Sequence, residues 1–456
     1  MPPTGAFTFV LHSHLPYARG PEERWPHGEE WLHEASADTY IPLIESLGRL
    51  AAEGIRGGVT LGLTPILLEQ LADVDVQGRF DEYLDYRQRA AEEDIVRFSQ
   101  SGEAQMEALA RMHAGRYQEA RRLFHEDYGR SLVQPFRKLA ATGVIEIMTS
   151  AATHGYLPLL SRDESIGLQI RTGIEAYRRH LGLVPKAMWL PECAYRPGKD
   201  GRPGIESFLS AHGIQVFFAE TDMVEGREVI VTPGSGRSQA TVFRPYQVRD
   251  SGVSVLARHR RACQQVWGSA EGYPGDFDYQ EFHKRERVSG LHYWRITGNE
   301  IPLEGKGLYD PARASARAGI QAEHFAGVVR QILQEHHEAT DEFGLLMVAF
   351  DTELFGHWWF EGVAWLEAVL RHLASSSDVE LTTASDYLGR HPADGRIDLP
   401  EGSWGEGGMH AVWDNPKTEW IWAVIHQAED RMVAAARTSP PDTPVLRQAL
   451  REFLLL

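Results

Sequence analysis

Cysteine is nearly absent from this sequence. Of its 456 residues only Cys193 and Cys263 are cysteines, and neither belongs to a cluster with the spacing of metal ligands. This argues against a disulfide-stabilised scaffold and against a zinc ribbon. Long apolar runs are missing as well, since none approaches the roughly 20 residues that a membrane-spanning helix needs. We therefore expect a cytoplasmic protein that is not embedded in a membrane.

Positive charge is also scarce. Lysines and arginines number 46 against 64 aspartates and glutamates, which gives a formal net charge of −18. Such a chain repels polyanions, so nucleic acid is not an expected partner, whereas a neutral ligand is not disfavoured. The sequence does contain twelve tryptophans, several of them in glycine-rich or histidine-rich stretches. Tryptophan fills protein cores, but its flat face can also stack on a sugar ring.

Short apolar or β-branched runs alternate with helical patterns along most of the chain. Most runs are apolar throughout, which is typical of parallel strands buried on both faces. The stretches between them, such as RDESIGLQIRTGIEAYRRHLG, have the apolar spacing of crossover helices. The predicted strands are residues 7–12, 58–64, 144–150, 187–191, 215–220, 253–258 and 345–351. Seven such strands predict an α/β fold in the form of an incomplete TIM-type (β/α)7 barrel.

Two further helical regions are expected beside the barrel. Residues 76–139 are charged and have helical apolar spacing, which predicts a helical insertion between the second and third strands. After about residue 390 the pattern changes to the loop PEGSWGEGGMHAVWDNP, which amphipathic helices follow. We expect a catalytic barrel at residues 1–390 and a C-terminal helical domain at residues 391–456. The apolar ending REFLLL indicates that this domain either docks on the barrel or continues in a longer chain.

Polar residues gather where the predicted strands end, which is the reactive edge of such a barrel. Glu192 ends the segment WLPE, and Asp351 ends the seventh strand. Each follows a strongly apolar segment, whose burial would raise the pKa of the carboxyl group. Two carboxylates in one cleft suit glycoside cleavage, in which one attacks the cationic sugar carbon and the other protonates the leaving oxygen. Structural ion pairs with Arg196 and Arg258 are the alternative.

His12 and His14 alternate on the first strand and therefore face the same way. Such a pair can hold a metal in a barrel hydrolase, where His154, His357 and Asp351 could complete the ligand set. Two neutral imidazoles can equally hydrogen-bond sugar hydroxyls with no metal. The residues alone leave both readings open, and with them a metal-dependent deacetylase as a remote alternative.

Five motifs in chain order carry a resemblance to a known family. They are LHSHLPY, GLTPILLEQL, WLPECAYRP, FDTELFGHWWFEGVAWL and WGEGGMHAVWDNPKTEW. Together they resemble the conserved regions of glycoside hydrolase family 57, and they are most similar to its 1,4-α-glucan branching enzymes. The resemblance runs across nearly the whole chain. It implies a (β/α)7 barrel with a helical insertion and a C-terminal helical domain, acting on α-glucan without a metal or other cofactor.

The resemblance also implies roles for individual residues. Glu192 matches the nucleophile, and Asp351 matches the general acid/base of a retaining mechanism. The remaining matches are substrate-binding positions, with the two histidines of the first motif in the donor site. They are His12, His14, Arg258, Trp267, Gly275, His357, Trp404 and Trp413. Retention predicts carboxyl groups about 5–5.5 Å apart.

The implied reaction cleaves an α-1,4 bond and transfers the chain to a 6-hydroxyl. An α-amylase-like hydrolase and a 4-α-glucanotransferase on the same scaffold are alternatives, and a glucan-binding protein without catalysis is another. Branching members of the family usually have a long, tyrosine-bearing loop over the active site, whereas residues 225–242 form a shorter stretch without aromatic residues. Family members also continue past REFLLL with a further acidic substrate contact. We therefore expect weak branching with substantial hydrolysis.

Overall fold

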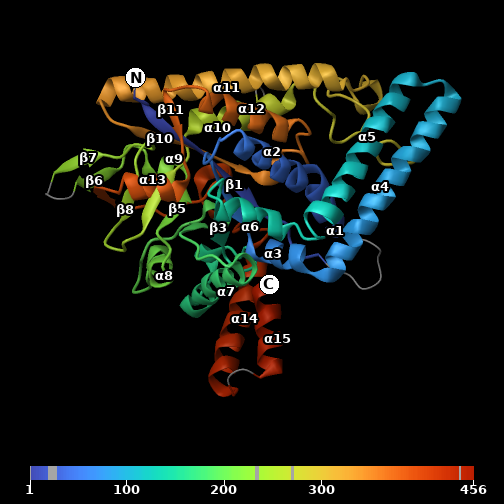
Figure 1. Cartoon of the computed structure of the whole chain (residues 1–456). Helices are drawn as coiled ribbons and strands as arrows, with labels where there is room; N and C mark the ends of the chain where they lie inside the picture. The colour runs from blue at the N-terminus through green and yellow to red at the C-terminus, as the bar shows by residue number, and fades with distance from the viewer. Residues whose placement is uncertain (1, 19–27, 232–235, 269–271, 441–442) are drawn as a thin grey trace.

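The structure is a computed structural model of the chain. It describes residues 2–18, 28–231, 236–268, 272–440 and 443–456. Figure 1 shows helices arranged around a central sheet. One pair of helices, in the region of the predicted insertion, projects from one side, and a second pair lies below the sheet.

Seven parallel strands form the centre of the fold. They are β1 (Gly5–Ser13), β2 (Val59–Leu63), β3 (Glu146–Ser150), β4 (Ala187–Trp189), β5 (Val216–Ala219), β9 (Ser254–Ala257) and β10 (Gly344–Asp351). Their order is β10-β1-β2-β3-β4-β5-β9, and each neighbouring pair is parallel. No strand ladder joins β9 to β10 among the described residues, although the His259 backbone N–H donates a 2.8 Å hydrogen bond to the Met347 carbonyl across this gap. All seven predicted strands are present, and the incomplete barrel is confirmed.

The burial of the strands explains why their sequences are so apolar. All nine residues of β1 are buried, and Phe7 and Phe9 pack against Phe325 of helix α11 (Pro311–Thr340). Fully burying one such side chain stabilises the fold by about 1.5–3 kcal/mol. The register pairs His12 of β1 with Asp351 of β10, so both residues reach the same edge of the sheet.

Helices connect and cover the strands. The connecting helices are α1 (Glu29–Ala35), a π-helix η1 (Ser36–Tyr40), α2 (Ile41–Ala52), α3 (Pro65–Ala72), α7 (Asp163–Leu181), α8 (Ile205–Ala211), α9 (Thr221–Val224), α10 (Arg260–Trp267), α11, α12 (Gly362–Ala374) and α13 (Ala384–Arg390). Local sequence sets the start of the longest one. Asp310 accepts hydrogen bonds from the backbone N–H groups of Ala312 and Arg313, and Pro311 occupies the first turn of α11.

Small strands extend the sheet beyond the barrel. They are β6 (Glu228–Val231), β7 (Arg237–Gln239), β8 (Tyr246–Val248), β11 (Val379–Leu381) and β12 (Gly395–Ile397). The strands β6 and β7 form an antiparallel hairpin that pairs with β12, and β12 also pairs with β8. This hairpin contains part of the stretch 225–242, whose residues 232–235 lie outside the described residues.

A long helical pair follows β2 and α3. Helix α4 (Val74–Ser101) and helix α5 (Ala104–Arg122) pack side by side and project from the barrel (Figure 1), and α6 (Val133–Ala141) leads into β3. The side chain of Asp73 caps the start of α4. Gly102, with φ 76°, ends it in the left-handed conformation that favours glycine. These helices lie on the stretch for which an insertion was predicted.

The chain ends in a second helical pair, α14 (Glu419–Thr438) and α15 (Pro444–Leu455), which lies below the sheet in Figure 1. Glu429 is fully buried and anchors α14, since its carboxylate accepts hydrogen bonds from the Ser161 N–H (2.8 Å) and the Arg162 N–H (3.1 Å). The Leu454 carbonyl accepts a 3.2 Å hydrogen bond from Gln169, so the end of α15 returns to the barrel. None of the described helices combines the length and the apolar character that crossing a bilayer requires.

Candidate active site

One cleft at the carboxyl edge of the sheet brings together five of the ten predicted site residues, including Glu192 and Asp351. Its cavity volume is about 400 Å³. Its lining comes from the ends of β4, β5, β9 and β10, from α10, and from the loop after β12. The lining residues are Glu192, Glu220, Arg258, Arg260, Cys263, Gln264, Trp267, Asp351, Trp404 and Gly405.

Glu192 has a strained backbone and a firmly held side chain. Its φ is 59°, a left-handed conformation that is costly outside glycine and that often marks a functional position. The indole Nε1 of Trp404 donates a 2.8 Å hydrogen bond to Oε2 of Glu192, and the Trp404 backbone N–H donates a 2.9 Å hydrogen bond to the Glu192 carbonyl. His154 Nε2 lies 3.6 Å from Oε1. Both carboxylate oxygens therefore have a neighbour that can donate a hydrogen bond.

The environments of Glu192 and Asp351 move their pKa values in opposite directions. Burial alone would raise the pKa of Glu192, but its interactions with His154 and Trp404 outweigh burial and lower the pKa. The pKa of Asp351 is raised to about 7, chiefly by burial and also by the negative charge of Glu192, while Arg258 opposes both effects. Near neutral pH the cleft therefore contains an ionised Glu192 carboxylate and an Asp351 carboxyl that is still protonated in a large share of the molecules.

The ion pairs considered as an alternative are not the ones that form. Arg196 donates hydrogen bonds to the backbone carbonyls of Pro197 and Pro203, both at 3.2 Å. Arg258 forms its ion pair with Glu220, and its guanidinium lies 5.5 Å from the centre of the Trp404 ring. Neither arginine neutralises Glu192 or Asp351 by direct contact, so both carboxyl groups are available for chemistry.

Three histidines and a tryptophan stack behind Glu192. The ring of His154 lies 4.6 Å from that of His12 and 4.1 Å from that of His14, and His12 lies 5.1 Å from Trp189. Burial is the main cause that lowers the pKa of His14 to about 2, and it also lowers the pKa of His12 strongly. His12 and His14 are therefore uncharged, and neutral imidazoles are suited to hydrogen bonding with hydroxyl groups.

The stacking also bears on the metal-site reading. Metal ligands point their nitrogen atoms at one centre, whereas these rings lie nearly parallel, with interplanar angles of 19° and 23° between His154 and its two partners. In the part of the chain that the structure describes, no group of three His, Cys, Asp or Glu residues is arranged to hold a metal ion. The geometry gives the deacetylase alternative no support.

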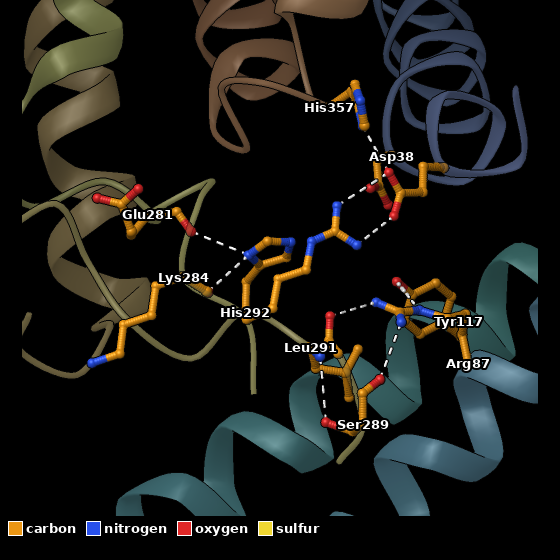
Figure 2. Close-up of polar contacts among 12 residues, drawn as sticks. Asp38, Arg87, Tyr117, Glu281, Lys284, Ser289, Leu291, His292 and His357 are labelled. Carbon is orange, nitrogen blue, oxygen red and sulfur yellow. Dashed lines mark hydrogen bonds and ion pairs between the residues drawn. The ribbon is translucent and has the colours of Figure 1, made fainter. Parts of the chain in front are cut away.

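Five predicted substrate-binding residues do not line the cleft: His12 and His14 belong to the stack described above, and the other three lie elsewhere. Gly275 lines a separate surface groove, in which no atom lies within 4 Å of where its Cβ would be. Trp413 lines an apolar hollow beside Tyr156, whose ring lies 5.4 Å away. His357 lies in a buried polar cluster, where its Nδ1 is 3.9 Å from Glu34 (Figure 2). Their substrate contacts remain predictions, as do the individual roles of the residues within the cleft.

Figure 2 shows what surrounds His357. The dashed line from its ring marks the contact with Glu34, which is not labelled, and Asp38, Arg87 and Tyr117 lie in the same cluster. His292 contacts the backbone carbonyls of Glu281 and Lys284 at 3.1 and 3.2 Å. Burial is the first cause that lowers the pKa of His357, so this ring is a neutral member of a packed polar network.

Two residues beside the candidate catalytic groups, one in the cleft lining and one next to Glu192, were missed as site residues. Glu220 ends the predicted strand 215–220 and pairs with Arg258, so the rule that places reactive groups at strand ends applies to it as well. His154 was considered only as a metal ligand, although it lies beside Glu192. It turns toward the cleft through a left-handed backbone, with φ 62°, and no sequence pattern signals this at a histidine.

Comparison with known proteins agrees with this geometry. The family model of glycosyl hydrolase family 57 matches residues 8–400, which is most of the chain and includes both carboxylates.

The chain belongs to glycosyl hydrolase family 57.

Among relatives in this family, a 1,4-α-glucan branching enzyme of Thermococcus kodakarensis is 42% identical over 473 aligned residues, which cover 99% of this chain and 68% of that enzyme. The crystal structure of a branching enzyme from Pyrococcus horikoshii has a TM-score of 0.89 and 41% identity, and it covers 99% of this chain and 83% of that one. The α-amylase AmyC of Thermotoga maritima has a TM-score of 0.87 and 27% identity, with 100% and 86% covered.

Proposed function

We propose that this protein is a retaining 1,4-α-glucan branching enzyme. Its family membership and two similar branching enzymes support the substrate class. The observation that carries the proposal is that Glu192 and Asp351 line one cleft whose contacts lower the pKa of Glu192 and raise that of Asp351. An ionised carboxylate beside a protonated carboxyl is what the first step of a double displacement needs.

In the first step the Glu192 carboxylate attacks the anomeric carbon of an internal α-1,4-linked glucose. The bond between that carbon and the bridging oxygen breaks, and Asp351 gives its proton to the departing 4-oxygen. The products are a glucan chain bound to Glu192 as an ester and a released chain with a new end. Neutral His12 and His14 offer hydrogen bonds to sugar hydroxyls beside Glu192.

In the second step Asp351 acts as a base. Esterification removes the negative charge of Glu192, which is one of the causes that raise the pKa of Asp351, so the pKa of Asp351 falls. Its carboxylate then takes the proton from the 6-hydroxyl of an acceptor chain. The 6-oxygen bonds to the anomeric carbon, the ester bond breaks, and Glu192 is released as a carboxylate with an α-1,6 branch formed.

Hydrolysis competes with this transfer, because water can take the place of the acceptor hydroxyl. None of the described residues of the stretch 225–242 lines the cleft, so this stretch supplies no aromatic cover over the reacting groups. The likeness to an α-amylase makes a glucan hydrolase the second candidate function. We propose that branching is accompanied by substantial hydrolysis.

Further parts of the proposal concern organisation and setting. Residues 1–390 form the catalytic unit, and residues 391–456 form a helical domain that places Trp404 against Glu192. A cytoplasmic setting is supported by Cys193 and Cys263, which are both free and buried, as is usual in a reducing compartment. Production of a branched storage glucan would follow from the reaction.

The test is to incubate the protein with amylose and to count two products in the same reaction. Proton NMR measures new α-1,6 linkages, and a reducing-end assay measures hydrolysis. Branching is supported if α-1,6 linkages form in a substantial share of the events. If reducing ends account for nearly all events, the protein is a hydrolase. If neither product forms but the chain lengths of the amylose are redistributed, it is a 4-α-glucanotransferase; if the chain lengths are also unchanged, amylose is not its substrate.

A further inference from the structure

A second buried carboxyl group lies close behind the candidate acid/base. Glu353 is in the short 3-10 turn Thr352–Leu354 that follows β10, only two residues after Asp351. Asp351 is half-buried at the cleft, whereas Glu353 is 4% exposed. Among the described residues no basic side chain pairs with Glu353, although an unpaired charge at such a depth is costly. Glu353 has no role in the two proposed steps of the reaction.

The contacts of Glu353 join three elements. Its Oε1 accepts a hydrogen bond from the hydroxyl of Tyr40, which is fully buried at the end of η1. Its carboxyl is also hydrogen-bonded by the backbone of His14, which follows β1. One side chain thus links the end of β1, the end of β10 and η1. A π-helical segment such as η1 is a common feature of functional sites.

Neighbouring contacts leave this junction little freedom to relax. The Ser13 hydroxyl donates a 2.7 Å hydrogen bond to the Thr352 hydroxyl oxygen. The His357 backbone N–H donates a 3.1 Å hydrogen bond to the Thr39 hydroxyl oxygen. Gly356, with φ 106°, lies so close to η1 that a Cβ would be 2.0 Å from the backbone oxygen of Asp38. A charge that appears on Glu353 therefore cannot be accommodated by moving the turn away.

The electrostatic surroundings keep Glu353 neutral. Its pKa is raised to about 8, chiefly by burial and also by the nearby Asp351, while the hydrogen bonds from Tyr40 and the His14 backbone oppose this. The residues whose interactions shift the pKa of Glu353 most are Tyr40 at the end of η1, His14 just after β1 and Asp351 at the end of β10. If Glu353 ionised, a second negative charge would lie behind Asp351 in a low-dielectric environment, and the two carboxyl groups would titrate as a coupled pair.

We propose that Glu353 is a positioning residue for the reaction. As a neutral acid bonded to Tyr40 and to the His14 backbone, it fixes Asp351 at the cleft, and its ionisation stops turnover. This inference rests on the acid/base role proposed for Asp351. Two groups must then be protonated for activity, so log kcat should fall with a limiting slope of −2 at high pH rather than −1.

The test compares the pH profiles of the wild-type protein and Glu353→Gln, with amylose as substrate. The amide keeps the volume and the acceptor oxygen for Tyr40 but does not ionise. We expect kcat at pH 6 to fall by no more than about threefold and the limiting alkaline slope to change from −2 to −1. In wild-type protein at pH 7, the infrared carbonyl band of a protonated carboxyl should lose intensity on this substitution, a readout that requires no activity.

Glu361→Gln is the matched control. Glu361 is also a buried acid, 6% exposed, with a 2.7 Å hydrogen bond from Tyr309 and a pKa that burial raises to about 7, but it lies outside the cleft. Its substitution should leave the alkaline slope at −2. If Glu353→Gln does not fold, Tyr40→Phe provides the test in its place. Loss of the hydroxyl should raise the pKa of Glu353 and move the second ionisation to higher pH.

Two results would overturn the inference. One is an alkaline slope and midpoint in Glu353→Gln equal to those of the wild-type protein. The other is a slope of −1 in the wild-type protein itself. Neither result contradicts the proposed function, which is refuted separately if the wild-type protein does not act on amylose at any pH.

Discussion

Trp404 holds Glu192 at two points, through its indole Nε1 to the side chain (2.8 Å) and through its backbone N–H to the main-chain carbonyl (2.9 Å). The same indole ring packs on Trp189, with 4.9 Å between ring centres, and Arg258 lies over it. A residue far along the chain therefore fixes both the orientation and the ionisation of the candidate nucleophile. This explains how a glutamate persists in a left-handed backbone conformation at the end of a short strand.

Replacing Trp404 with Phe should test this directly. Phenylalanine keeps an aromatic ring but removes the donor to Glu192, and a hydrogen bond to a charged group contributes about 1.5–3 kcal/mol. We expect kcat/KM to fall about 10- to 100-fold. Because the lost bond lowers the pKa of Glu192, the acidic limb of the kcat/KM profile should move to higher pH. Trp267→Phe is the control, since Trp267 lines the cleft without bonding to Glu192; a limb that moves equally in both variants contradicts the argument.

Glu192→Gln should abolish turnover while leaving the fold intact. The amide has the same volume and can still meet Trp404, but it cannot form the ester intermediate. We expect activity on amylose to fall at least about 10,000-fold, with a circular dichroism spectrum and a melting temperature close to those of the wild-type protein. Substantial activity in a folded variant would remove Glu192 from the role of nucleophile.

The ionisation of Asp351 should cause the first part of the loss of activity at high pH. Its pKa is raised to about 7, chiefly by burial, and the first step needs the protonated form. Activity should therefore decline as pH rises through about 7. In Asp351→Asn, glucosides with poor leaving groups should be slowed far more than activated aryl glucosides, because only poor leaving groups depend on protonation. Equal slowing of both classes would argue against the acid/base role.

The parts of this site that sequence could predict are those that local pattern controls. The strands that end near Glu192 and Asp351 are buried on both faces, so their composition identifies them, and barrel geometry then places their ends at one edge. Glu220 obeys the same rule and could have been found. Glu353 is signalled more weakly, as a carboxylate that stands between Thr352 and the apolar Leu354.

Other parts depend on contacts between distant segments. The strands β6, β7, β8, β11 and β12 have only three or four residues each, several of them exposed, so pairing partners rather than composition determine them. His357 follows the Asp351 motif closely, yet the turn at Gly356 directs it into the cluster of Figure 2. Gly275 and Trp413 line other hollows for the same reason: tertiary packing, not spacing in the sequence, decides where they point.

The buried histidine stack should make stability depend on pH. Burial lowers the pKa of His14 from 6.5 to about 2, so between these values the unfolded chain binds a proton that the folded protein excludes. Stability from this group is present above pH 6.5 and is lost as pH falls toward 2. We expect the melting temperature to drop between pH 7 and pH 4, and His14→Gln to reduce that drop.

The control for the stability measurement is His372→Gln on the exposed side of α12. This substitution should leave the drop in melting temperature between pH 7 and pH 4 unchanged. An equal drop in the wild-type protein and in His14→Gln would show that His14 does not exclude a proton in the folded state.

The ratio of transfer to hydrolysis should rise when a longer segment shields the cleft from water. Residues 232–235 lie outside the described residues, and the flanking strands β6 and β7 contain no aromatic side chain. Replacing 232–235 with a longer segment that carries a tyrosine should shield the ester at Glu192 from water, because an acceptor hydroxyl competes with bulk solvent only where water is excluded. We expect the ratio of α-1,6 linkages to reducing ends to rise severalfold, with the rate of α-1,4 cleavage changed little.

A segment of equal length with phenylalanine in place of tyrosine separates the effect of cover from that of the hydroxyl. An unchanged ratio in both variants would mean that water reaches the ester by another route.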